Sequence, residues 1–136
     1  MSTSTKPPEF LLLIRSTDWD KGLSPEQIQD VMGRFMGWLD NLTQQGKLKG
    51  AQPLEPEGKV VSGKNGRIVA DGPFAESKES VGGYFLLRVD EFEEALAIAQ
   101  ACPMLEHGSS LEVRPVAESC PHMRKYQFET AGATAA

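Results

Sequence analysis

The sequence predicts one α+β domain in which two helices cover one face of an antiparallel sheet. Three observations lead to this fold class. Patterns of strand and helix follow one another in the order strand, helix, strand, hairpin, strand, helix, strand. Two of the strand patterns are apolar on both faces, and 136 residues are enough for one hydrophobic core. The domain is expected over residues 10–117, with loose tails at residues 1–9 and 118–136.

The first strand and the first helix have the clearest patterns. Phe10–Ile14 is a continuous apolar run, which indicates a strand that is buried on both faces at the centre of the sheet. Ser24 is a capping residue, a proline follows it, and Gln27 completes a capping box, so a helix begins here. Its apolar residues recur at helical spacing as far as Leu42, and Gly46 is placed to end it.

A weak strand and a hairpin occupy the middle of the chain. Lys49–Leu54 contains a proline, which removes a backbone donor, so this strand is expected at an edge of the sheet. Lys59–Val61 and Arg67–Val69 flank a turn with the pair Asn65-Gly66, which is typical of a β-hairpin. We therefore expect a hairpin inserted between the two halves of the domain.

The second half repeats the order of strand, helix and strand. Tyr84–Val89 is apolar on nearly both faces and predicts a second central strand. Asp90 is expected to cap the second helix, which a proline ends. Leu111–Val116 alternates, with two apolar side chains on one face and Glu112 and Arg114 on the other.

Two helices can cover only one face of this sheet, although both central strands are apolar on both faces. The uncovered face would expose an apolar patch of roughly several hundred Å², which a soluble monomer normally does not tolerate. We therefore expect a homodimer in which two sheets pack face to face. Ligand pockets would then form between the sheets, or where the long loops meet.

Composition and charge exclude several classes of function. Nineteen acidic and fourteen basic residues give a net charge of −5, which argues against direct binding of nucleic acid or an anionic membrane. The longest early apolar run, Phe10–Ile14, is too short for a signal peptide or a membrane helix. Two cysteines make no disulfide framework. We expect a cytoplasmic protein.

Three motifs carry a resemblance to a known family: Asp71 to Glu79 (Asp-Gly-Pro-Phe-Ala-Glu-Ser-Lys-Glu), Gly82-Gly83-Tyr84, and His107-Gly108 followed by Glu112 to Val116. In these motifs the chain resembles the DGPF proteins of the YCII-related family, from about Phe10 to Val116. The resemblance implies a ferredoxin-like fold of the dimeric α+β-barrel type, in agreement with the apolar faces. It implies no particular reaction. The narrower YCII proteins carry a His–Asp pair as a candidate dyad, but here both histidines lie in the last third of the chain, so that dyad is not transferred.

Asp71 and His107 are the candidate catalytic residues. Asp71 can act as a general base or bind a ligand, but it can also set a tight turn. His107 lies next to a glycine, and a histidine suits proton transfer because imidazole titrates near neutral pH. The alternative for a single loop histidine is a structural or exposed role.

Four further residues are candidates for ligand binding: Arg114, Glu112, Tyr84 and Lys78. If the helices cover the apolar side of the last strand, Glu112 and Arg114 point into the space between the sheets. Arg114 can then bind a carboxylate through two hydrogen bonds, or the charges can form a salt-bridge network. For Tyr84 the alternative is packing, and for Lys78 it is a solvated turn. No metal is expected, because Cys120 and His122 have no matching second pair. No cofactor is expected, because the sequence contains no phosphate-binding glycine loop.

The sequence therefore favours a small-molecule-binding protein whose ligand is a small anionic or carbonyl compound. Cofactor-free proton transfer would use Asp71 as base, His107 as its acid–base partner and Arg114 as an anion clamp. The alternative is a non-catalytic regulatory protein. DGPF-like proteins are often found alongside extracytoplasmic-function sigma factors, so the resemblance permits a protein partner in transcriptional signalling. The sequence leaves open whether the protein is an enzyme.

Overall fold

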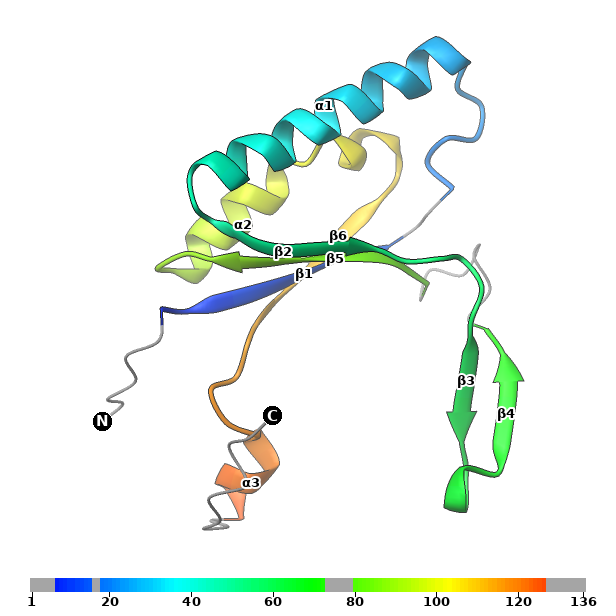
Figure 1. The fold of residues 1–136 in the computed structure, drawn as a ribbon, viewed down its shortest axis with the longest axis vertical. Coiled ribbons are helices and arrows are strands. Elements are labelled where there is room, and N and C mark those ends of the chain that lie inside the picture. Colours follow the sequence, from blue (N-terminus) through cyan, green and yellow to red (C-terminus); the bar gives the residue numbers. More distant parts are fainter. Residues whose placement is uncertain (1–6, 16–17, 73–79, 127–136) are drawn as a thin grey trace.

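Two long helices lie on a four-stranded antiparallel sheet in the part of the chain that the computed structural model describes, residues 7–15, 18–72 and 80–126 (Figure 1). In chain order the elements are β1 (Glu9–Arg15), α1 (Pro25–Gln44), β2 (Leu48–Pro53), β3 (Lys59–Ser62), the 3-10 turn η1 (Lys64–Gly66), β4 (Ile68–Asp71), β5 (Val81–Arg88), α2 (Phe92–Gln100), the 3-10 helix η2 (Pro103–His107), β6 (Ser110–Pro115) and α3 (Pro121–Lys125). The two long helices lie on the same side of the sheet.

The strand order in the sheet is β2-β5-β1-β6, and every neighbouring pair is antiparallel. The two strands that are apolar on both faces, β1 and β5, are therefore the central ones, as predicted. β2 contains Pro53 and lies at an edge, where a missing backbone donor costs least, also as predicted.

Helix α1 begins at the predicted capping box. The Ser24 hydroxyl accepts a hydrogen bond from the Gln27 amide, and the Gln27 side chain accepts one from the Ser24 amide. Gly46 follows the helix with a φ of 74°, in the left-handed region that favours glycine. Trp38 packs edge-on against Phe85 at 5.6 Å between ring centroids, so it has the packing role expected of an aromatic at the edge of the apolar stripe.

Helix α2 and the C-terminal segment differ from the prediction in two details. The N-cap of α2 is Glu91, without a side-chain cap, so the prediction of an Asp90 cap was wrong. Ala95 and Ala99 are buried, because small side chains let this helix approach the sheet closely. Residues Pro121–Lys125, expected within a loose tail, form the short helix α3.

The core lies between the sheet and the two long helices. Alternate residues of the central strands point toward the helices and are almost fully buried: Phe10, Leu12, Phe85 and Leu87. Their neighbours lie on the opposite face and are only partly buried: Leu11, Leu13, Tyr84 and Leu86. We call this second surface the open face of the sheet.

Strand β6 follows the predicted alternation. Leu111 and Val113 pack against the core, whereas Glu112 and Arg114 lie on the open face opposite Leu13 and Leu11 of β1. The fold class is thus an α+β domain with helices on one face of an antiparallel sheet, as predicted. Dimerisation through the open face stays a prediction.

The predicted hairpin forms a separate two-stranded sheet from β3 and β4. The connection between the strands runs from Gly63 to Arg67, and the Gly66 amide donates a hydrogen bond to the Gly63 carbonyl at 3.0 Å. Asn65 and Gly66 both have positive φ angles, 62° and 67°, which Asn and Gly adopt more readily than other residues. At the base of the hairpin the Gly72 amide donates a hydrogen bond to the Gly58 carbonyl at 3.1 Å. In Figure 1 the hairpin projects away from α1 and α2.

A helix that crosses a bilayer must be both long and apolar. Among the described residues, no helix is long and apolar enough to do so.

Candidate functional site

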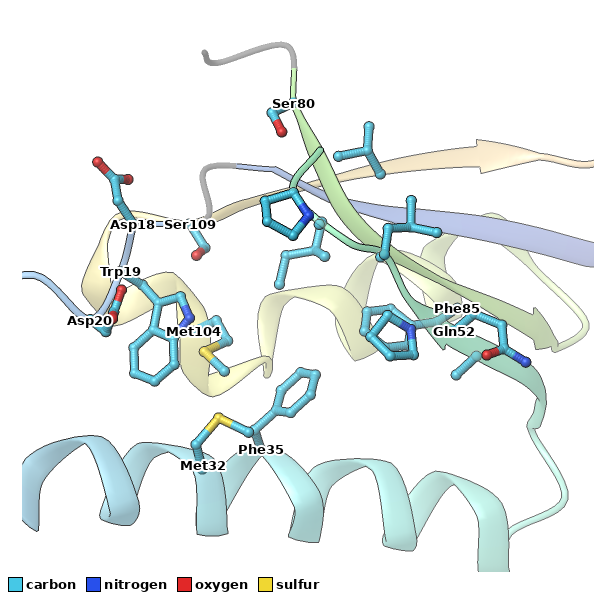
Figure 2. A pocket seen from close by; sticks show the side chains of 18 of the residues that line it. Asp18, Trp19, Asp20, Met32, Phe35, Gln52, Ser80, Phe85, Met104 and Ser109 are labelled. Carbon is cyan, nitrogen blue, oxygen red and sulfur yellow. The ribbon is translucent and has the colours of Figure 1, made fainter. Parts of the chain in front are cut away.

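A cavity of about 830 Å³ lies between helix α1 and the edge of the sheet formed by β2 and β5 (Figure 2). Its volume falls within the range of roughly 300–1,000 Å³ that is common for small-molecule sites. The wall combines residues of α1, β2, β5, the loop after β1 and the segment around η2: Ile14, Asp18, Trp19, Asp20, Lys21, Met32, Phe35, Met36, Leu39, Ala51, Gln52, Pro53, Leu54, Pro56, Ser80, Val81, Gly82, Gly83, Phe85, Met104 and Ser109.

Helix α1 supplies much of the apolar wall. Met32, Phe35, Met36 and Leu39 are three or four residues apart, so they lie on one side of the helix. Met32 and Met36 are 37% and 50% exposed, and these values reflect their place beside the cavity instead of inside the packed core. Methionine side chains are flexible and polarizable and adapt to ligands of different shape.

The glycines at the start of β5 keep the opposite wall free of side chains. Gly82 and Gly83 both line the cavity. A Cβ atom on Gly83 would lie 2.9 Å from the Gln52 carbonyl oxygen and 3.3 Å from the Pro53 Cα, both in β2. The absence of a side chain at Gly83 therefore permits this close approach of the β2 and β5 backbones.

One side of the cavity carries several polar side chains, whereas Gln52 lies beside Phe85 on the other side (Figure 2). Figure 2 shows Asp18, Trp19 and Asp20 on the side opposite Phe85. Two backbone hydrogen bonds shape this loop, from Lys21 to the Asp18 carbonyl and from Leu23 to the Asp20 carbonyl, both at 3.2 Å. The site therefore has an apolar interior with a polar side made largely by one loop.

Two buried hydroxyl groups add to the polar wall. Ser80 and Ser109 are 5% and 6% exposed, and both line the cavity. They come from distant parts of the chain, before β5 and before β6. A hydroxyl can both donate and accept a hydrogen bond, so these residues can serve a carbonyl or a hydroxyl on a ligand.

The charged residues in the cavity wall are two carboxylates and one ammonium group. Lys21 Nζ lies 3.7 Å from Asp18 Oδ2, so the lysine charge is partly offset within the wall itself. The second carboxylate, Asp20, is exposed to solvent. Carboxylates accept hydrogen bonds and repel anions. This wall therefore suits a ligand that carries donors and is neutral or cationic.

His107 contacts the loop residue Trp19 but does not line the cavity. Its ring packs against Trp19, with ring centroids 6.4 Å apart. Its Nε2 atom is buried and has no hydrogen-bond partner among the described residues. In this arrangement His107 supports the aromatic side chain that does reach the cavity.

Asp71 lies at the end of β4 in the hairpin, where it is exposed and forms an ion pair with its cross-strand neighbour Lys59. It does not line the cavity. Asp71 and His107 therefore do not meet at this cavity, because Asp71 belongs to the hairpin and His107 to η2. Lys78 lies outside the described residues, as does most of the motif around it.

The other three predicted ligand-binding residues meet on the open face. Tyr84 and Glu112 flank Leu13 in the register of β5, β1 and β6. Glu112 Oε1 lies 2.7 Å from Arg15 Nη2, and Glu112 Oε2 lies 3.8 Å from Arg114 Nε. This arrangement corresponds to the salt-bridge alternative that the sequence left open, and the three residues lie across the sheet from the cavity.

Several residues of the cavity were not predicted as functional. Trp19 between two aspartates in a polar loop was a visible signal, since aromatic side chains are uncommon in such loops. Ser80 and Ser109 carried no such signal, because only the packing of β5 and β6 brings them to one wall.

The described residues offer little support for a metal site or a reactive thiol. No cluster there of three or more His, Cys, Asp or Glu side chains could hold a metal ion. Cys102 is buried, and burial raises the pKa of its thiol. A buried thiol with a raised pKa is a poor nucleophile.

One similar solved structure is that of 5-chloro-2-hydroxyhydroquinone dehydrochlorinase (TftG) from Burkholderia phenoliruptrix AC1100, in complex with 2,5-dihydroxybenzoquinone. The two chains are 13% identical with a TM-score of 0.40, and the similarity covers 84% of this chain and 97% of that chain. No curated protein matches the chain.

The family of the chain follows from its sequence. The YCII-related domain matches residues 9–119, which span the whole sheet and both long helices. This protein belongs to the YCII-related family.

Proposed function

We propose that this protein binds a small, largely apolar molecule with one hydrogen-bonding end in the cavity between α1 and the sheet. The observation that carries the proposal is the cavity itself, with its volume of about 830 Å³ and its wall of methionine, aromatic and aliphatic side chains. A large apolar pocket with a few converging polar groups is the usual form of a small-molecule site.

The wall also favours a class of ligand. Phe35, Phe85 and Trp19 offer ring faces and edges, and the methionines offer sulfur atoms, so a ring-bearing ligand gains contacts that an aliphatic one does not. The carboxylates of Asp18 and Asp20 would accept hydrogen bonds from a hydroxyl or amine of the ligand. Of the anionic and carbonyl compounds expected from the sequence, the carbonyl compound fits this wall better.

Proton transfer without a cofactor is the chemistry that this cavity could perform. Asp20 is the candidate base, since its carboxylate adjoins the cavity and has no ion pair with a described residue. Asp71 and His107 would need a second site to act, because neither reaches this one. The effect of replacing Asp20 with asparagine on the proton-exchange rate distinguishes a ligand that is converted from one that is only bound.

A homodimer and membership of the DGPF subgroup form part of the proposal. The sequence Asp71-Gly72-Pro73-Phe74 supports the subgroup. The half-buried leucines Leu11 and Leu13 on the open face support a dimer in which two sheets pack together. Neither the described residues nor the comparisons support the alternative of a protein partner in transcriptional signalling.

The test measures the binding of two probes, naphthol and naphthoate, which share one ring system and differ in charge. Titration calorimetry should show tighter binding of naphthol. Met36→Gln should weaken it by about 1 kcal/mol, or roughly fivefold, because a half-exposed apolar wall residue becomes polar. Leu96→Gln is the matched control, since Leu96 is exposed on α2 and does not line the cavity.

Equal effects of Met36→Gln and Leu96→Gln, or no binding of either probe, would contradict the proposal. Asp20→Asn tests the chemical part. For a carbonyl substrate identified by screening, the rate of proton exchange at the carbon next to the carbonyl should fall at least about 100-fold. Asp40→Asn, an exposed carboxylate on α1 outside the cavity, should leave that rate unchanged. If the proton-exchange rate is unchanged in Asp20→Asn, Asp20 is not the base, and the cavity proposal is reduced to ligand binding.

A further inference from the structure

The hairpin of β3 and β4 exposes large aliphatic side chains on both of its faces. Val60, Val61, Ile68 and Val69 are 45%, 63%, 55% and 60% exposed. Val61 and Val69 are cross-strand partners, and Val60 pairs with Ala70 on the other face. These β-branched residues favour the strand conformation, but in this chain alone they add almost nothing to a hydrophobic core.

A two-stranded hairpin is at best marginally stable in water without a surface to pack on. Every residue of β3 and β4 is exposed, so the described part of this chain provides no such surface. A sheet of two strands with apolar residues on both faces is typical of an arm that packs on another molecule. The hairpin therefore requires another molecule to cover its aliphatic side chains.

The direction of the hairpin indicates a second copy of the chain. Figure 1 shows that it projects on the side of the sheet opposite α1 and α2. This is the side of the open face, which carries Leu11, Leu13, Tyr84 and Leu86. A second copy that packs its sheet on the open face would therefore lie within reach of the hairpin.

Charge also favours a second copy. The segment Lys59–Asp71 contains two lysines, one arginine and one aspartate, a net charge of +2, and since the whole chain carries −5 the remainder carries −7. Lys64 and Arg67 at the tip form no ion pair with any described residue. Glu118, exposed between β6 and α3, likewise has no ion pair in the described part of the chain. A basic arm is complementary to the acidic body of another protomer.

We propose that the β3–β4 hairpin is an arm that packs its aliphatic side chains and its basic tip against a second copy of this chain. The proposal rests on the face-to-face dimer proposed above and adds a second region of contact to it. Each protomer then covers part of its partner with its own hairpin, as a two-fold symmetric interface requires.

Sedimentation equilibrium of the full chain tests the proposal. In the double variant Val61→Thr/Val69→Thr, the side chains keep their shape and strand preference but gain hydroxyl groups. We expect the dissociation constant of the dimer to rise roughly tenfold or more, because each new hydroxyl group would be buried in an apolar contact. Leu96→Thr, on the outer side of the helices, is the control that should leave it unchanged. Lys64→Glu/Arg67→Glu should also weaken the dimer, and more strongly at low salt.

The outcomes separate the two proposals. If Leu13→Asp dissociates the dimer while the hairpin variants do not, the arm is contradicted and the face-to-face dimer stands. If the wild-type chain is a monomer, both the arm and the face-to-face dimer are contradicted. The proposed ligand-binding function is tested independently by the binding of naphthol. Lysine cross-linking of mixed light and heavy isotope-labelled copies should link Lys64 to a lysine of the other copy. Links from Lys64 within one copy alone would also overturn the proposal.

Discussion

The two faces of the sheet have nearly the same apolar sequence and very different environments. On the helix-covered face Leu12 and Leu87 are fully buried, whereas Leu11 and Leu13 on the open face are only partly covered. Alternation along a strand sends neighbouring residues to opposite faces, so a run of leucines supplies both at once. An apolar run in the sequence therefore shows which side chains can be buried. Which of them are buried depends on the face that α1 and α2 cover.

The covered face itself is not uniform. It is filled under the middle of α1, where Trp38 and Phe35 pack on Phe85. Toward the β2 edge the glycines of β5 leave the cavity open. The site therefore lies where the covered face meets the edge of the sheet.

The largest expected effect comes from substituting neighbouring leucines of β1. Leu12→Ala should lower the free energy of unfolding by about 2–5 kcal/mol, because it leaves a cavity in the packed core. Leu13→Ala should cost less than about 1 kcal/mol in dilute protein, since its side chain is already partly hydrated. Urea unfolding measures both. If both substitutions lower the free energy of unfolding equally, the open face is buried in solution. If the loss for Leu13→Ala also increases with protein concentration, a dimer is what buries that face.

Gly83→Ala tests the edge of the covered face. The new methyl group would meet the Gln52 carbonyl oxygen at 2.9 Å, so β2 must move, at a cost of about 1–3 kcal/mol. Naphthol affinity should fall as well, because Gly83 lines the cavity. Gly37→Ala on α1 is the control: its Cβ meets no atom within 4 Å, and we expect a gain of about 0.5–1 kcal/mol. A neutral Gly83→Ala would mean that β2 is not held tightly against β5.

The smallest expected effect concerns an ion pair on the helix side. Glu94 Oε2 lies 2.8 Å from Lys47 Nζ, and this hydrogen bond lowers the pKa of the Glu94 carboxyl. A lowered pKa in the folded state means stability that is present above the unfolded pKa, about 4.3, and lost as the pH falls through the folded value. Wild type should therefore lose more stability than Glu94→Gln between about pH 5 and pH 3.

Glu93→Gln is the control for that measurement, because Glu93 is the exposed neighbour of Glu94 on α2 and has no ion pair with a described residue. Its pH dependence should match wild type in thermal unfolding scans at several pH values. If Glu94→Gln keeps the wild-type pH dependence, the ion pair does not couple α2 to β2 in solution.

The predicted site shows where sequence reasoning stops. Asp71 was expected to act as a base together with His107 and Arg114. In the described structure Asp71 belongs to the hairpin, where its register places it opposite Lys59, whereas Ser80 to Gly83 line the cavity. The Asp71 carboxylate therefore does not line this cavity, whereas the glycines that follow its motif do.

Short-range sequence patterns were enough to predict the local structure of this protein. The capping box at Ser24, the turn at Asn65-Gly66 and the apolar runs of β1 and β5 act over a few residues, and each formed as predicted. The cavity could not be predicted in this way, because its wall joins the loop around Trp19, the methionines of α1 and two serines from distant segments. Contacts between such segments depend on how the elements pack on one another, and short-range patterns do not encode that packing.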